Sequence, residues 1–296
     1  MASLFSFGRP FASVAGRKAG RGAWRWRGSA PEEPRGGEQG QLSALIEREI
    51  IPRLVAAHPR AQQAPALTRA PAVIGNEVAT FTTLVMTAEV DVLLDYLDQL
   101  IARAVPIESI LIELLAPTAR RLGEFWEQDY CDFIDVTMAL WRLQEVVHEL
   151  AARVPAAVAR PIGRRALFAP MPGGQHSFGA VVMDEIFTRD GWATERLTET
   201  TTPELLARLA ADSFDLVGLT VSCDCHMRAL PALITAMRNV SSNARLCVMV
   251  GGRVFNEDPE RAVQVGADGT AADARLAVAL ATQLVDARVR AATIAA

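Results

Sequence analysis

The fold of this chain is decided by the stretch Ala166-Leu167-Phe168-Ala169-Pro170-Met171-Pro172-Gly173-Gly174-Gln175-His176-Ser177-Phe178-Gly179. Its first six residues form an apolar run of strand length, and a loop with two glycines and an imidazole follows. A helical pattern begins after Phe178. A buried strand that passes through a glycine loop into a helix is typical of the first unit of a parallel α/β sheet.

The same strand and helix unit recurs toward the C-terminus. The strand-like runs are 166–171, 192–197, 214–221, 245–250 and a short one at 267–269. Helical stretches separate them, and a last helix is predicted over 275–289. We therefore predict a doubly wound, Rossmann- or flavodoxin-like α/β domain over residues 165–290, with a five-stranded parallel sheet and a tail at 291–296.

The chain before this domain has a different period. Apolar residues recur there at intervals of three and four, which predicts helices over 42–50, 78–104, 107–127 and 133–154. Short connections between helices favour a bundle, so residues 41–154 are predicted to form a helical cap domain. Residues 155–164, which contain two prolines and a glycine, are predicted to link the two domains.

Charge is distributed unevenly along the 296 residues. Residues 1–28 carry six Arg or Lys side chains and no acid, so a total of −4 leaves about −10 for the remainder. We predict a disordered basic arm over 1–40, in which Trp24 and Trp26 interleave with arginines. The arm is either a solvated tail or a segment that makes weak contacts to DNA or to a partner. The acidic remainder argues against a general nucleic-acid-binding surface.

Composition predicts a cytoplasmic protein with no membrane association. Half of the residues are hydrophobic, but no apolar run approaches the roughly 18 residues that span a bilayer. The four cysteines show no disulfide-framework spacing, which favours a reducing compartment.

Ligand-binding residues are expected where the strands end, because the loops at the carboxyl edge of a parallel sheet form its binding crevice. His176 lies in the loop after the first run, Thr220 and Ser222 end the third, and Gly251-Gly252 end the fourth. A neutral imidazole is a common metal ligand, and adjacent glycines admit a large flat ligand. A polar surface histidine is the alternative interpretation of His176.

This arrangement resembles the cobalamin-binding domain of vitamin B12 proteins, whose pattern is Asp-x-His-x-x-Gly, then Ser-x-Leu, then Gly-Gly. His176 and Gly179 match the first element, Thr220-x-Ser222 stands at the second and Gly251-Gly252 match the third. The resemblance covers about residues 163–290. It implies that His176 ligates cobalt from below, that Ser177 flanks this ligand, and that the displaced nucleotide tail lies beside the other two elements.

One position departs from that pattern. Gly174 stands where the family has the aspartate that holds the imidazole. A carboxylate in this place fixes the tautomer of the histidine and raises its basicity as a ligand. Its absence counts against methyl-transfer or radical enzymes of the family, so we expect a binding protein rather than an enzyme.

The helical half resembles the cap of B12-dependent photoreceptors over residues 114–126, which implies that Trp126 lies over the upper cobalt face. A bundle-core aromatic is the alternative interpretation of Trp126. Photoreceptors that bind adenosylcobalamin follow this tryptophan with Glu-His, whereas this chain has Val136-Thr137. The departure favours the hydroxo or aquo form of cobalamin over the adenosyl form.

Without Glu-His, the chain resembles the AerR/PpaA antirepressors of photosynthetic proteobacteria over residues 40–290. The matching peptides are 214–226 and 251–255. The resemblance implies a light-responsive, cobalamin-binding transcriptional regulator that binds a PpsR/CrtJ-type repressor of photosynthesis genes. The alternatives are a corrinoid carrier for methyl transfer and a haem-binding redox sensor, which needs only an axial histidine.

Two further sets of residues are candidates for metal binding. Cys223, Cys225 and His226 lie close together, but no fourth zinc ligand is visible nearby, so placement beside the cofactor is favoured. His148 is interpreted as a surface residue, with a role as upper cobalt ligand as the alternative.

Overall fold

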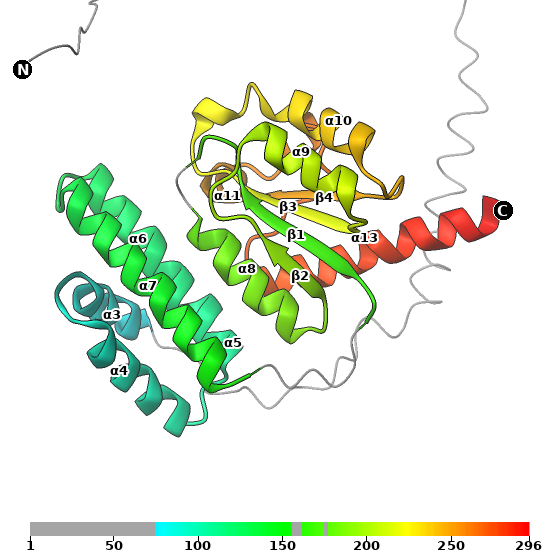
Figure 1. The fold of residues 1–296 in the computed structure, drawn as a ribbon. Coiled ribbons are helices and arrows are strands. Elements are labelled where there is room, and N and C mark those ends of the chain that lie inside the picture. Colours follow the sequence, from blue (N-terminus) through cyan, green and yellow to red (C-terminus); the bar gives the residue numbers. More distant parts are fainter. Residues whose placement is uncertain (1–74, 156–161, 175–176, 296) are drawn as a thin grey trace, which may run out of the picture. The chain divides into compact units, whose positions relative to one another are not determined.

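Four parallel strands form the centre of the C-terminal half of the chain (Figure 1). In this computed structural model the described residues are 75–155, 162–174 and 177–295, so the predicted arm 1–40 and helix 42–50 lie outside them. The strand order is β2-β1-β3-β4. The bounds are Arg165–Pro170 for β1, Ala193–Arg196 for β2, Leu216–Thr220 for β3 and Cys247–Gly251 for β4.

The prediction of a fifth strand at 267–269 is wrong. Gly269 makes a single parallel bridge to Met249, and no further pairing follows. The run is too short to build a ladder. The Asp268 N–H donates to the Val248 carbonyl at 2.7 Å, but the return bond from the Val248 N–H goes to the Asp268 carboxylate, also at 2.7 Å, and not to a backbone carbonyl. The described sheet therefore has four strands, bordered on the β4 side by this bridge.

Helices cover both faces of the sheet, which confirms the predicted α/β class (Figure 1). Strand side chains alternate between the two faces. Phe168 and Met249 pack with α8 (Phe178–Arg189) and α13 (Ala274–Ala295). Leu167 and Val250 pack on the other face, where α9 (Thr202–Ala211) and α10 (Leu230–Val240) lie. Because both faces of β1, β3 and β4 are buried, these three strands are almost continuously apolar in sequence, whereas the border strand β2 is polar and partly exposed.

The helical half differs from the prediction in one helix. Residues 78–104, predicted as one helix, form α3 (Gly75–Thr87) and α4 (Val90–Ala102), separated by the extended backbone of Glu89 at ψ 163°. A single helix of that length would extend about 40 Å in a straight line. The break lets Leu97 of α4 enter the same buried core as Phe81 of α3.

The next predicted helix, 107–127, is continuous but not uniform. It comprises α5 (Ile107–Ser109), a π-helical segment η3 (Ile110–Leu115) and α6 (Ala116–Glu127). Pro117 is the second residue after the π segment, and its missing N–H removes one α-helical hydrogen bond there. The last helix of this half, α7 (Phe133–Arg153), begins with a capping box between Asp132 and Asp135.

The helical half and α8 share one hydrophobic core. Phe178, Val181 and Ile186 of α8 are buried in the same cluster as Leu143 and Val147 of α7. Polar contacts accompany this packing, since Arg189 donates to the Val154 carbonyl at 2.7 Å. None of the helices in the described ranges is long and apolar enough to cross a membrane.

Asp268 connects the β4 border to two helices. Besides accepting the Val248 N–H, its carboxylate is paired with Arg288 of α13 at 2.6 Å and with Arg238 of α10 at 2.9 Å. Arg288 also donates to the Leu246 carbonyl at 2.9 Å. The side chain of Asp268 is 17% exposed, so these charge-assisted bonds lie largely out of water.

An ion pair between Arg208 and Glu195 connects α9 to β2, and it makes the stability of the protein depend on pH. Arg208 donates to both carboxylate oxygens of Glu195, one at 2.6 Å, and its bond and charge hold the pKa of Glu195 below the ordinary value of 4.5 against partial burial. A lowered pKa gives stability that is complete above pH 4.5 and is lost as the pH falls through the folded-state pKa.

We expect Glu195→Gln to lower the free energy of unfolding at pH 7 by about 1 kcal/mol, because both partners are partly solvated. The difference from the parent protein should shrink as the pH falls below 4.5, where Glu195 itself becomes neutral. Urea unfolding at pH 7 and pH 3.5 measures this, with the exposed Glu199→Gln as control. A difference that does not change with pH would contradict the assignment.

Candidate functional site

The strand order places the candidate site at the carboxyl ends of β1 and β3. The chain leaves β1 toward β2 on one side and returns to β3 on the other. In open α/β sheets this reversal leaves a crevice outside the strand ends, where ligands bind. The loops that frame it here are 171–177 after β1, 221–229 after β3 and 252 onward after β4.

The loop after β1 begins with a tight turn. The Gly174 N–H donates to the Met171 carbonyl at 2.7 Å, and Gly173 has φ +82°, as a type II turn with Pro172 at its second position requires. A Cβ on Gly174 would lie 2.9 Å from the Met171 oxygen. A side chain at Gly174 therefore requires the turn to shift. The next two residues, Gln175 and His176, lie outside the described residues.

The loop ends where α8 begins, against the end of β3. Ser177 is buried at 8% exposure, and its hydroxyl lies 3.4 Å from the Gln144 amide nitrogen of α7. A Cβ on Gly179 would lie only 3.2 Å from the Thr220 methyl group. The first turn of α8 thus packs closely on Thr220, and glycine at 179 leaves room for this contact.

Thr220 and Gly251 are direct neighbours across β3 and β4. The Thr220 hydroxyl is buried, and it has no hydrogen-bond partner among the described residues. A Cβ on Gly251 would meet no atom within 4 Å in the same part of the structure, so open space adjoins this position. Such an unsatisfied buried hydroxyl beside open space is expected where a ligand supplies the missing partner.

Gly252, unlike Gly251, has a backbone conformation and a close backbone contact that require glycine. Its backbone has φ +108° and ψ −179°, a region that only glycine adopts readily. A Cβ would lie 2.3 Å from the Val221 carbonyl oxygen. Gly252 therefore lets the loop after β4 approach the loop after β3, next to Ser222, which is partly buried.

Trp126 is not a core residue, so that alternative interpretation is wrong. It lies in the last turn of α6 and is 47% exposed. Trp126 is one of several large apolar side chains that are exposed between residues 126 and 141. They are Trp126, Tyr130, Phe133, Ile134, Met138 and Trp141.

Electrostatics relate the end of α6 to the loop after β4. The pKa of Arg253 is raised, first by its hydrogen bond to Glu257 and further by Asp224 and by Glu127 of α6. Arg253 opens the short helix α11 (Arg253–Glu257), directly after Gly252. Glu127, the residue after Trp126, is thus one of the acids whose charge favours the protonated form of Arg253.

The residues in place of Glu-His offer no strong ligand. Val136 is buried in the core of the helical half, and Thr137 donates its hydroxyl to the Phe133 carbonyl at 2.6 Å. His148, farther along α7, is exposed, as predicted.

The cysteines after β3 are paired, which the sequence did not predict. Cys223 and Cys225 form a disulfide, and Asp224 between them opens the 3-10 turn η4 (Asp224–His226). Across the described residues no cluster of three or more His, Cys, Asp or Glu side chains is arranged to hold a metal ion.

Asp224 bridges the two loops. It is paired with Arg261 of α12 (Arg261–Gln264) at 2.7 Å and with Arg253 at 3.3 Å. The hydrogen bond from Arg261, and then the Arg253 pairing, holds the pKa of Asp224 below its ordinary value despite some desolvation.

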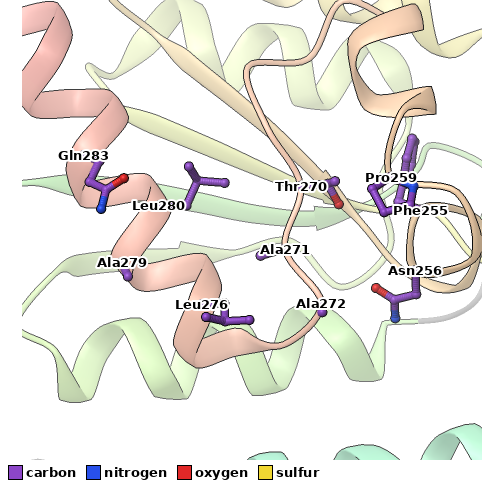
Figure 2. Close-up of a pocket in the computed structure, with 10 residues that line it drawn as sticks. All are labelled: Phe255, Asn256, Pro259, Thr270, Ala271, Ala272, Leu276, Ala279, Leu280 and Gln283. Carbon is purple, nitrogen blue, oxygen red and sulfur yellow. The ribbon is translucent and has the colours of Figure 1, made fainter. Parts of the chain in front are cut away.

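A cavity of about 410 Å³ lies between α11 and α13, and the sequence did not predict it (Figure 2). The Thr270 hydroxyl in its wall is buried without a partner among the described residues. The lining is Phe255, Asn256, Pro259, Thr270, Ala271, Ala272, Leu276, Ala279, Leu280 and Gln283.

Comparison with solved structures identifies the architecture. The Methanosarcina barkeri monomethylamine corrinoid protein superposes with a TM-score of 0.58 at 15% sequence identity, over 71% of this chain and 98% of that one. The chain shares its fold with a corrinoid protein. A novel cobalamin-binding protein from Desulfitobacterium hafniense DCB-2 is 15% identical over 70% of this chain, but its TM-score of 0.38 is too low to establish a common fold.

Sequence comparison finds a relative in Rhodobacter capsulatus. An uncharacterized 20.5 kDa protein in the bchF-crtJ intergenic region of Rhodobacter capsulatus is 28% identical over 182 residues, covering 61% of this chain and 94% of that protein. No model of a known protein family matches the sequence.

Proposed function

We propose that this chain is a cobalamin-binding regulatory protein that acts as a light-responsive antirepressor. The observation that carries the proposal is the carboxyl edge of a corrinoid-protein fold, where the partnerless Thr220 hydroxyl and the open space at Gly251 adjoin. Both features suit a large ligand that enters between β3 and β4 and brings hydrogen-bonding groups with it.

The predicted site residues fit this cofactor. His176 would bind cobalt from below, with Ser177 and Gly179 positioning its loop. Thr220, Ser222, Gly251 and Gly252 would line the path of the nucleotide tail, and the exposed indole of Trp126 would cover the upper face. Cobalamin would supply a cobalt centre that accepts an imidazole ligand. The protein residues would bind this group and orient it.

A binding role is preferred to catalysis because of the turn at Gly174. The enzymes that the chain resembles hold their histidine with an aspartate at this position, and here a Cβ would meet the Met171 oxygen at 2.9 Å. A corrinoid carrier for methyl transfer is the second candidate, favoured by the fold shared with the monomethylamine corrinoid protein.

The regulatory part rests on the relative from the bchF-crtJ intergenic region and on the predicted resemblance to the AerR/PpaA antirepressors. A protein partner of the PpsR/CrtJ type suits a chain that carries about −10 outside its first 28 residues, because this charge repels DNA. The basic arm would add only a weak, salt-dependent contact to DNA.

The test is the absorbance spectrum of the purified full chain after incubation with hydroxocobalamin or haemin and gel filtration. Retained cobalamin bands in a base-off form support the proposal, and a Soret band without cobalamin supports the haem-sensor alternative. Methyl transfer to the bound corrinoid from a methyltransferase would favour the carrier.

Light should govern loading of the cofactor rather than a chemical turnover. The reason is that Trp126 is retained and exposed while Val136-Thr137 replace the residues that photoreceptors use to trap the photolysed cobalt. We expect the apo-protein to take up methylcobalamin only after illumination, and then as the aquo form. Spectra of protein fractions mixed in darkness and in light measure this. Equal uptake in both would remove light sensing from the proposal.

The partner is tested by pull-down of a PpsR/CrtJ-type repressor with the full chain and with residues 1–28 removed, each in apo and cobalamin-loaded form. We expect both versions to bind the repressor, because the acidic remainder is the proposed interface. Loss of binding on truncation would make the basic arm the docking element instead.

A further inference from the structure

The disulfide between Cys223 and Cys225 lies in the loop after β3, at the carboxyl edge of the sheet, and is partly exposed to solvent. Cys225 is exposed and Cys223 is half-buried, directly after the predicted site residue Ser222. The cysteines are only two positions apart in sequence. A disulfide that closes so short a loop removes little entropy from the unfolded chain, so stabilisation of the fold does not account for it.

We propose that Cys223 and Cys225 form a redox-active pair whose state is transmitted through Asp224 to the loop after β4, so that a dithiol reductant controls the ligand edge. The part of this inference that concerns cofactor affinity rests on the proposed cobalamin binding. The redox chemistry and its effect on the loops do not.

The exposure of the two sulfurs sets the direction of the exchange. A thiolate of the reductant attacks the exposed Cys225 sulfur, the disulfide bond breaks, and Cys223 leaves as a thiolate. The Cys225 backbone N–H already points to the Cys223 sulfur at 3.1 Å and stabilises the leaving charge. The second thiol of the reductant then displaces Cys225. The reductant ends as a disulfide, and the two cysteines take up two electrons and two protons.

Asp224 carries the change to the neighbouring loop because it lies inside the disulfide ring. While the ring is closed, the backbone around Asp224 is restrained, and its carboxylate is held toward Arg261 and Arg253. Arg253 follows Gly252, whose close approach to Val221 joins the same two loops. Opening the ring frees the turn and weakens both pairings, so the two loops lose one of their connections.

The oxidised protein should therefore bind ligand more tightly than the reduced one, since a pre-organised loop loses less entropy on binding. A coupling between two sites of this kind typically changes affinity by about fivefold or more. We expect reduction to weaken hydroxocobalamin binding by about that factor.

The first measurement counts thiols in the full chain, quenched and denatured after treatment with diamide or with a dithiol. Two free thiols, Cys131 and Cys247, are expected after oxidation and four after reduction. The double variant Cys223→Ser/Cys225→Ser should show two free thiols under both conditions. The control variant Cys131→Ser should still lose two free thiols on oxidation. Four free thiols in the oxidised folded protein would overturn the proposal.

The second measurement compares amide hydrogen exchange in both redox states for 222–227 and 253–261. We expect amide exchange to become faster in both segments when the disulfide is reduced. In the Asp224→Asn variant, reduction should speed exchange only in 222–227. Exchange that is identical in both states would overturn the proposal even if the disulfide forms.

Cobalamin titrations in both states complete the test. A fivefold difference that disappears in Asp224→Asn supports transmission to the ligand edge, and equal affinities overturn it. If no variant binds cobalamin in either state, the proposed function fails, whereas the thiol count and the exchange still decide whether the pair is redox-active.

Discussion

Replacing Gly252 by alanine is expected to destabilise the protein by about 2–4 kcal/mol, the sum of backbone strain and overpacking. The backbone at φ +108° lies where a Cβ is disfavoured, and the added atom would lie 2.3 Å from the Val221 carbonyl oxygen. That carbonyl belongs to the chain leaving β3, so relief of the clash would require the two loops of the site to separate. A loss of this size is a large part of the stability of an ordinary domain.

Gly251→Ala is the matched control, because a Cβ there meets no described atom within 4 Å. We expect its free energy of unfolding to stay within about 0.5 kcal/mol of the parent value. Urea unfolding of the two variants, followed by far-UV circular dichroism, measures the contrast. Equal stability of both variants would show that the loop after β4 does not need the backbone conformation found at Gly252.

Replacing His176 by alanine should remove most of the bound cobalamin or leave it with its own base on cobalt. Even loss of a group that only supports a metal ligand typically costs about tenfold or more in affinity, so loss of the ligand should cost at least as much. The variant is incubated with hydroxocobalamin, passed over a gel-filtration column and examined by absorbance.

The control for this experiment is His148→Ala, an exposed histidine on α7. It should retain the parent spectrum, and a loss there would support the alternative that His148 is an upper ligand. An unchanged spectrum and unchanged retention for His176→Ala would refute its role in binding cobalt. His176 lies outside the described residues, so this experiment also tests an interpretation that rests on sequence alone.

Strands β1, β3 and β4 were predictable because their burial on both faces leaves long apolar runs in the sequence. The juxtaposition of Thr220 and Gly251 followed from the same fact, since parallel strands end at one edge. The break at Glu89 was not predictable, because the helical period continues across it and neither glycine nor proline marks it. The fifth strand failed because a short apolar run does not reveal that only Gly269 pairs.

The parts of the site that were missed depend on contacts between distant segments. The sequence left open the alternative that Trp126 is a core aromatic, because such contacts decide which face of α6 the bundle leaves uncovered. The cavity beside Thr270 arises where α11 and α13 diverge, and no side chain type announces it (Figure 2). The pairing of Cys223 with Cys225 requires the 3-10 turn that brings the two sulfurs together.

The carboxylate of Asp268 also bears on how the protein avoids self-association. An uncovered border strand presents N–H and C=O groups that can recruit a strand from another molecule and seed aggregation. Along β4 the Val248 N–H is taken by this carboxylate, and the Val250 N–H by the Gly269 carbonyl. An incoming strand would have to displace a charge already held by Arg238 and Arg288. Asp268→Ala should therefore be more prone to aggregate than its loss of stability alone would explain.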